Sequence, residues 1–326
     1  MFKRLFFFPK DNLVVVVPLL LVVGFITGLF VDTTPLKKFI LPVTVLMIYP
    51  TMIGFQPSQL LKKSHGKLVL VSLAINFLIV PVLAYIIGST LLSSDPQLFA
   101  GLAISALLPT SNMTVAFTML AKGNVSAAVK LTVISLIMGS ILAPWYLLVM
   151  VGKYVPIDPI TTMKTIAFVV FIPMILGVLS YKSLLTKYSP EQFNKKIKPY
   201  LPAFSAWGMV YIMFTSVSMN AERITGRWDL VGVALLGQVV FYVINYGLAT
   251  TVASKLFNRE DGYALVYGTV LRNLSISLGL AATSFGPNAA LMVTIAFLLQ
   301  QQGAAWFVKL DEKFHFFSNP QTSLGK

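Results

Sequence analysis

The chain has 326 residues, of which 56% are hydrophobic and 11% are charged. Soluble domains carry about 25% charged residues, so this composition excludes a soluble enzyme, a nucleic-acid-binding domain and a disordered chain. The net charge is +14, which in a membrane protein reflects basic cytoplasmic loops, and the absence of cysteine excludes disulfides, thiolate metal sites and cysteine nucleophiles.

Runs without charged residues indicate the membrane spans, because a helix needs about 20 apolar residues to cross the hydrocarbon core. In chain order the runs cover 12–31, 39–61, 68–94, 96–121, 131–152, 165–181, 199–221, 230–254 and 262–308. The last run is interrupted only by Arg272 and is long enough for two helices, with a turn at Phe285-Gly286-Pro287-Asn288. The sequence therefore predicts an all-α integral membrane protein with ten transmembrane helices.

Basic residues are unevenly distributed between the expected loops. If the N-terminus lies in the cytoplasm, the inside segments hold 17 Lys and Arg residues and the outside segments hold six. Because basic residues favour the cytoplasmic side, we predict a multi-pass protein of the plasma membrane with both termini in the cytoplasm.

Ten spans divide into two halves of five, and an odd number of spans per half gives the halves inverted topology. Ile75-Asn76-Phe77 in the third span is matched by Ile244-Asn245-Tyr246 in the eighth. We predict one five-helix repeat over 1–155, a second over 156–315, and a flexible C-terminal tail over 316–326.

Two spans have polar centres. The fourth contains a proline, which removes a helix hydrogen bond, followed by hydroxyl and amide side chains that can bond to the freed backbone groups. The ninth has a similar polar centre without proline. Such a pair indicates a transporter's binding site, although small polar residues also occur at ordinary helix contacts. The candidate substrate-binding residues, including an amide of the third span and two cations, are Asn76, Thr110, Ser111, Asn112, Thr114, Lys130, Arg272, Asn273 and Ser275.

Lys130 and Arg272 are the two charges inside the expected spans, and all 11 acidic residues fall in loops or tails. Arg272 lies roughly 15 Å deep, where an unpaired charge costs about 2.5–3.5 kcal/mol. Its guanidinium either binds a carboxylate, sulfonate or phosphate, or is satisfied structurally by carbonyl, Asn and Thr oxygens. Lys130 is either buried, where it binds the substrate or couples transport to protons, or it extends its side chain to the cytoplasmic surface.

The chain resembles the bile acid:sodium symporter family. The resemblance rests on Pro109-Thr110-Ser111-Asn112-Met113-Thr114, on Leu120-Ala121-Lys122-Gly123-Asn124, and on Asn273 with its flanks. It implies two inverted five-helix repeats with interrupted, crossing fourth and ninth helices. It also implies a core of spans 3–5 and 8–10, a panel of spans 1, 2, 6 and 7, alternating access, and sodium coupling to an organic anion.

The sequence departs from this family where the resemblance implies sodium sites. At the first site this chain keeps the family's hydroxyls as Thr114 and Thr132. It has Val115 where the family has an amide side chain, and Ala128 where the family has another hydroxyl. At the second site Asn76 is kept, while a carboxylate becomes Gly268 and a glutamine becomes Arg272. We therefore interpret Lys130 and Arg272 as fixed charges that replace the two sodium ions.

These features predict a secondary transporter of a small organic anion, with sodium coupling weakened or absent. No catalytic residue, metal site or cofactor is expected, and the expected partners are the anion and the lipid bilayer, not nucleic acid, with the protein as a monomer or homodimer. The alternatives are a conventional sodium symporter, an arsenite efflux carrier, which in the related carriers has a cysteine at Thr110 and a glutamate at Ser275, and a membrane-embedded enzyme.

Overall fold

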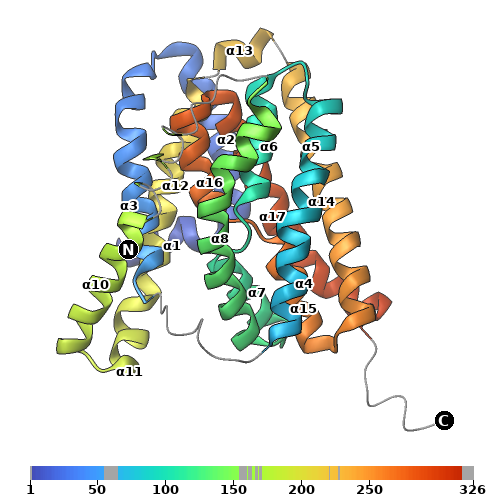
Figure 1. Cartoon of the computed structure of the whole chain (residues 1–326). Helices are drawn as coiled ribbons and strands as arrows, with labels where there is room; N and C mark the ends of the chain where they lie inside the picture. Colours follow the sequence, from blue (N-terminus) through green and yellow to red (C-terminus); the bar gives the residue numbers. More distant parts are fainter. Residues whose placement is uncertain are drawn as a thin grey trace.

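The computed structural model describes residues 2–54, 65–153, 160, 164–165, 168, 171–219, 221–226 and 228–317. Figure 1 shows helices standing side by side in a bundle. Helices are expected here because, in lipid, each backbone N–H and C=O must find a partner within the protein. The boundary predicted between the two repeats, near residue 155, and the tail from 318 onward lie outside the described residues.

The first half of the chain supplies the helices up to Val151, and the second half supplies those from Ile172 onward. Their bounds are α1 (Phe2–Asp11), α2 (Leu13–Phe30), α3 (Ile40–Met52), α4 (Gly66–Ala74), α5 (Val80–Leu91), α6 (Pro96–Leu107), α7 (Asn112–Leu120), α8 (Val125–Val151), α10 (Ile172–Lys187), α11 (Pro190–Gln192), α12 (Leu201–Ser218), α13 (Ala221–Gly226), α14 (Trp228–Leu256), α15 (Arg259–Val270), α16 (Leu274–Leu280) and α17 (Pro287–Phe314).

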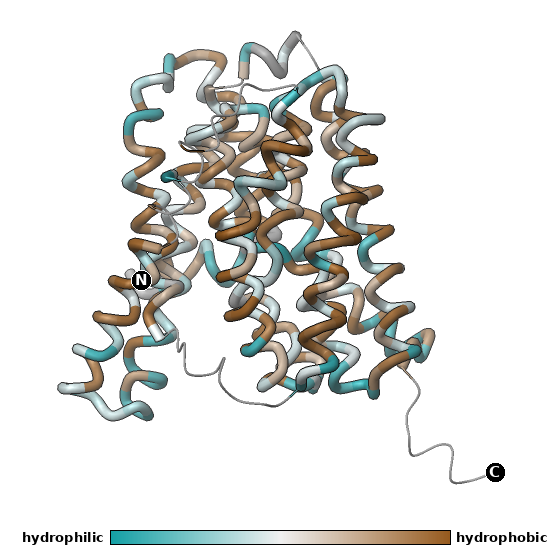
Figure 2. Tube along the Cα trace, in the orientation of Figure 1, coloured by the Kyte–Doolittle hydropathy of each residue, from teal (hydrophilic) through white to brown (hydrophobic). Residues whose placement is uncertain are grey.

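Five helical stretches among the described residues are long and apolar enough to cross a membrane, and they are Gly66–Leu91, Val125–Val151, Pro190–Ser218, Trp228–Leu256 and Pro287–Phe314. Arg4–Asp11 and Val15–Phe30 together pass the same test, but they are bent by 96°. Large apolar side chains on these helices are exposed, such as Leu70 and Val149 at 70% and 75%, and Figure 2 shows hydrophobic residues along most of the height of the helices. The chain is an all-α integral membrane protein.

Both predicted interruptions are present. The fourth run divides into α6 and α7, and the ninth run divides into α15 and α16. In the first break Pro109 has no N–H to donate, and Thr110 has a φ of 64°, which a β-branched residue rarely adopts. The second break, between Val270 and Leu274, forms without a proline.

The two broken helices have matching dimensions. α6 and α15 each contain 12 residues, and their positions differ by 163 at both ends, 259 minus 96 and 270 minus 107. The starts of α7 and α16, and of α8 and α17, differ by 162. The elements around the two breaks therefore follow one another at almost the same spacing in both halves of the chain.

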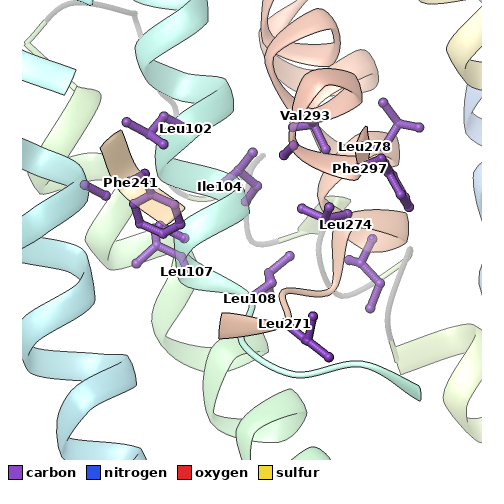
Figure 3. Packing of buried hydrophobic residues seen from close by; sticks show 14 of the residues in the cluster. Leu102, Ile104, Leu107, Leu108, Phe241, Leu271, Leu274, Leu278, Val293 and Phe297 are labelled. Atoms are coloured by element: carbon purple, nitrogen blue, oxygen red, sulfur yellow. The ribbon is translucent and has the colours of Figure 1, made fainter. Parts of the chain in front are cut away.

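The breaks lie in the most deeply buried part of the molecule. In α6 all residues from Leu98 to Leu107 are buried, and in α15 so are all residues from Gly262 to Val270. Figure 3 shows Leu108 and Leu271, one from each break, in an apolar cluster that also includes Phe241 of α14 on one side and Phe297 of α17 on the other. A side chain at the centre of this cluster has no access to lipid or bulk water.

The remaining helices form two groups. α12 packs against α2 and α3, and α10 packs against α3. α6 packs against α5, α8 and α17, while α15 packs against α7, α8 and α14. The first group contacts the second mainly through α16, α17 and the turn of helix over 281–285, which pack on α2, α3 and α12.

Candidate functional site

The two breaks contact each other directly. Pro109 and Arg272 form an isolated antiparallel β-bridge, and the backbone N–H of Asn273 donates to the carbonyl of Leu108 over 2.8 Å. Pro109 and Arg272 are 163 positions apart, the same spacing that separates α6 from α15. The polar centres predicted on the fourth and ninth spans therefore meet where the two chain segments cross.

Two helices begin at this crossing. Ser111 caps α7, because its hydroxyl accepts the N–H of Met113 while the Thr114 hydroxyl accepts the N–H of Ser111, each over 3.2 Å. Asn273 caps α16, since its side-chain oxygen accepts the N–H of Ile276 over 3.3 Å. The positive ends of two helix dipoles therefore point at the crossing.

Arg272 is fully buried, with 0% exposure. Its Nη1 donates to Oδ1 of Asn76 over 2.9 Å and to the carbonyl of Ala106 over 3.2 Å, and its guanidinium lies 5.9 Å from the ring centroid of Phe241. Its Nε and Nη2 have no hydrogen-bond partner among the described residues. The guanidinium is thus held by neutral oxygens and an aromatic face.

Gln300 of α17 holds the backbone of the second break. Its Oε1 accepts the N–H of Arg272 over 2.7 Å, and its Nε2 donates to the carbonyl of Arg272 over 3.2 Å. The hydroxyl of Tyr242 donates to the same Oε1 over 3.1 Å. The side chain therefore replaces backbone bonds that the helix loses at the break. In the sequence, the cluster Gln300-Gln301-Gln302 is unusually polar for a membrane helix and predicts either a cavity lining or bonds across helices, and Gln300 makes such bonds. Tyr242 was not predicted as a site residue, because it does not belong to an interrupted span.

The three positions predicted to correspond to the second sodium site lie together. Asn76 of the π-helical turn Ile75–Ile79 bonds through Oδ1 to Arg272, and its Nδ2 donates to the carbonyl of Gly268 over 3.0 Å and to the Ser72 hydroxyl over 3.2 Å. Asn76 is therefore fixed in one orientation, with its oxygen toward the guanidinium.

The positions predicted for the first sodium site gather where α7 meets α8. The Thr114 hydroxyl donates to the carbonyl of Tyr267 over 3.3 Å, and the Thr132 hydroxyl donates to the carbonyl of Ala128 over 2.8 Å. The Thr110 hydroxyl lies 3.4 Å from the carbonyl of Thr132. Two further positions on these helices, both half-buried, are Val115 and Lys130.

The candidate residues differ in accessibility. Ser111, Asn273 and Ser275 are half-buried, as are Thr132 and Lys130, whereas the fully buried members of the set are Asn76, Thr110, Thr114 and Arg272. The side chain of Asn112, the first residue of α7, lies outside the described residues. Three half-buried residues of the crossing, Ser111, Asn273 and Ser275, thus carry hydroxyl and amide groups, whereas the guanidinium is fully buried.

One acidic residue is not where the sequence predicted it. Asp311 was expected in the polar segment after the last span, but it belongs to α17 and is 2% exposed. Its Oδ2 accepts the hydroxyl of Tyr263 over 2.5 Å and pairs with Arg259 at 3.4 Å. Phe317 is also buried, against Tyr263, so the packed chain continues past residue 316.

The amino-acid sequence is similar to those of known transporters. The sequence profile of the Sodium Bile acid symporter family matches residues 41–227, more than half of the chain. The chain is 24% identical over 261 residues to the uncharacterized protein YbaS of Bacillus subtilis, covering 77% of this chain and 81% of that protein. It is 27% identical to the probable chloroplastic sodium/metabolite cotransporter BASS2 of Oryza sativa, covering 65% of this chain and 46% of that protein.

The arsenical-resistance protein Acr3 of Corynebacterium glutamicum is 22% identical over 261 residues, which cover 76% of this chain and 70% of that protein. The matched family consists of symporters, so the chain is a transporter and not an enzyme. By the extent of the profile match, the chain belongs to the sodium bile acid symporter family.

Proposed function

We propose that the chain is a secondary active transporter of a small organic anion, which works by alternating access with sodium coupling weakened or absent. In this proposal Arg272 and Lys130 take the places of the two sodium ions as charges fixed to the protein. The proposal includes ten spans in two inverted repeats, over 1–155 and 156–315, in the plasma membrane with both termini in the cytoplasm, as a monomer or homodimer.

The contacts of Arg272 are the observation that carries the proposal. Its Nη1 bonds to the Asn76 amide oxygen and to the carbonyl of Ala106. Neutral oxygens of this kind are what a sodium ion takes as ligands, and the carbonyls at the end of α6 form the negative end of a helix dipole. A guanidinium that already occupies these oxygens supplies the positive charge that sodium would otherwise bring.

An anion would complete the electrostatics of the crossing. Two nitrogens of Arg272, Nε and Nη2, find no hydrogen-bond partner among the residues that the structure describes, and an uncompensated buried charge is costly. The starts of α7 and α16 add positive dipole ends next to the half-buried Ser111, Asn273 and Ser275. These three side chains offer donors to a carboxylate or sulfonate at the accessible face, while Arg272 acts on the anion from behind.

Two observations support the inverted repeats. The elements around both breaks keep an offset of 162 or 163 residues. The bridge joins Pro109 to Arg272, which are separated by the same offset. An antiparallel contact between two corresponding residues is what a two-fold axis through the crossing produces.

The second candidate is a conventional sodium-coupled symporter. It is favoured by the similarity to proteins such as the probable sodium/metabolite cotransporter BASS2 of Oryza sativa. Arsenite efflux is suggested by the similarity to Acr3, but Thr110 and Ser275 lack the thiol and carboxylate that the resemblance to those carriers requires.

The test is the thermal stability of the purified protein in detergent with a panel of small carboxylates and sulfonates, in sodium and in potassium. A ligand of the folded state raises the melting temperature with occupancy. We expect one anion to stabilise the native chain equally in both salts. Arg272→Gln should lose this response or make it sodium-dependent, and the matched control Arg272→Lys should keep it in potassium. Stabilisation of the native chain in sodium alone would favour the conventional symporter.

A further inference from the structure

Two aspartates lie at the starts of the two broken helices, at opposite ends of the bundle, and make similar contacts. At the upper end in Figure 1, Asp95 caps α6, with Oδ1 accepting the N–H groups of Gln97 and Leu98, each over 3.0 Å. Its Oδ2 accepts Nδ2 of Asn288, in the first turn of α17, over 2.7 Å. A second hydrogen bond joins α17 to α6, from the N–H of Asn288 to Oε1 of Gln97 over 3.3 Å.

The lower end has the equivalent pair. Asp261 lies in the first turn of α15, and its Oδ1 accepts Nδ2 of Asn124, also over 2.7 Å. Asn124 caps α8 through its Oδ1, which accepts the N–H of Ala127 over 3.0 Å. The N–H of Asn124 donates to the carbonyl of Glu260 over 3.0 Å. At both ends, therefore, the backbone N–H of the asparagine makes a second hydrogen bond beside the side-chain pair.

The two pairs follow the same rule. Each joins an aspartate at the start of one broken helix, Asp95 as the N-cap of α6 and Asp261 in the first turn of α15, to an asparagine at the start of the long helix that follows the other broken helix. Hydrogen bonds to a carboxylate are about twice as strong as neutral ones. Together with the bridge at the crossing, the pairs connect the two segments at the top, the middle and the bottom.

We infer that Asp95–Asn288 and Asp261–Asn124 are matched clamps that make 95–151 and 258–314 one rigid body, so that the crossing keeps its geometry when the transporter changes conformation. The inference concerns how the site is held and does not depend on the identity of the substrate or the coupling ion. Failure of the proposed anion transport would therefore leave it intact, and its own failure would leave that proposal intact.

The test substitutes aspartate for asparagine and asparagine for aspartate, which changes the clamps and keeps the oxygen atoms that cap the helices. Asn124→Asp retains a capping oxygen for α8 but sets two carboxylates against each other. Asn124→Asp combined with Asp261→Asn restores the hydrogen bond, with the amide at position 261 as the donor and the carboxylate at position 124 as the acceptor. Asn288→Asp, alone and with Asp95→Asn, forms the same pair of variants at the upper end. Asn258→Ala, which removes the cap that accepts the N–H of Asp261 over 2.9 Å, is the control for loss of a cap alone.

The readout is amide hydrogen exchange of the peptides that cover 108–111 and 271–273, measured on the purified full chain. We expect either single variant to raise exchange at both breaks by about tenfold, which corresponds to about 1.4 kcal/mol, and each double variant to restore the native rate. Asn258→Ala should raise exchange only near the start of α15. Exchange that rises only beside the substituted residue, that does not recover in the double variants, or that rises equally in the control would overturn the inference.

Discussion

At the scale of single residues, the crossing depends on Gln300. Its amide bonds to both backbone groups of Arg272 and accepts the Tyr242 hydroxyl. Gln300→Leu has a similar size but leaves these buried groups unpaired, so we expect the free energy of unfolding to fall by about 2–4 kcal/mol. Denaturant titration in mixed micelles measures it. The half-buried Gln302 is the matched control, and Gln302→Leu should change stability by less than about 1 kcal/mol. Equal effects of the two substitutions would contradict this role.

The burial of Arg272 could be predicted from the sequence, because counting residues from the end of an apolar run places it near the middle of that run. Of its two partners, Asn76 was placed in the same site by the family resemblance, and Ala106 was not predicted. Asn76 lies 196 positions away and Ala106 lies 166 positions away, and no local pattern connects such residues. The sequence left two roles open for this guanidinium, which were binding an anion and bonding to carbonyl and amide oxygens, and the structure shows bonds of the second kind to a fully buried side chain.

At the scale of helices, close packing of α6 on α17 requires glycine at position 101. A Cβ there would lie 2.5 Å from the carbonyl oxygen of Ala289 and 2.7 Å from Cβ of Met292. Because backbone cannot move aside cheaply, we expect Gly101→Ala to destabilise the protein by about 1–3 kcal/mol.

Gly232 of α14 is the matched control for that prediction, since a Cβ there meets nothing within 4 Å. Gly232→Ala should be neutral or stabilise the helix by up to about 1 kcal/mol, because alanine has the higher helix propensity. Both variants can be compared by the same titration in mixed micelles. A neutral Gly101→Ala would mean that α6 and α17 are not held as closely as the structure has them.

The existence of the helices and of both breaks could be predicted, because apolar runs and polar interruptions are local features. The precise limits of the breaks could not. Pro109 marks the first one, but the second contains no proline, and its ends depend on bonds from Gln300 of α17 and from Leu108 in the first break, which are distant in the sequence. The final turn of α17, with Asp311 buried, was missed because a charged segment was taken to lie in a loop or tail.

At the scale of the whole molecule, the sequence predicted ten spans from charge-free runs, and five of the described stretches are individually long and apolar enough to cross a membrane. Four of the five other runs differ for structural reasons. The fourth and ninth runs are divided by their breaks, the 13-residue α3 is shorter than a membrane-crossing helix, and the helix of the first run passes the test only together with α1, from which it is bent by 96°. The sixth run lies partly outside the described residues. Hydropathy measures how apolar a segment is, whereas the path of the backbone depends on contacts between segments.

The contact between the two helix groups gives a prediction about the whole molecule. A Cβ on Gly279 of α16 would lie 2.1 Å from Cγ2 and 2.8 Å from Oγ1 of Thr44 in α3. Gly279→Ala should therefore separate α16 from α3 near the upper end. Ser216 of α12, which is 1% exposed, lines a small cavity there with Lys37, Ala282 and Pro287. The chain has no cysteine, so Ser216→Cys provides a single labelling site.

We expect a membrane-impermeant maleimide to modify Ser216→Cys slowly in the native background and at least about tenfold faster with Gly279→Ala, since about 1.4 kcal/mol of lost packing is enough for that factor. Thr44→Ala removes the two nearest atoms and should slow the reaction again. Gly247→Ala, where a Cβ meets nothing within 4 Å, is the control and should have no effect.

Reagent added to intact cells should reach the cysteine, because the upper end lies outside when both termini are cytoplasmic. Labelling only in inside-out vesicles would reverse that orientation, and a rate unaffected by Gly279→Ala would mean that α16 does not close the upper end.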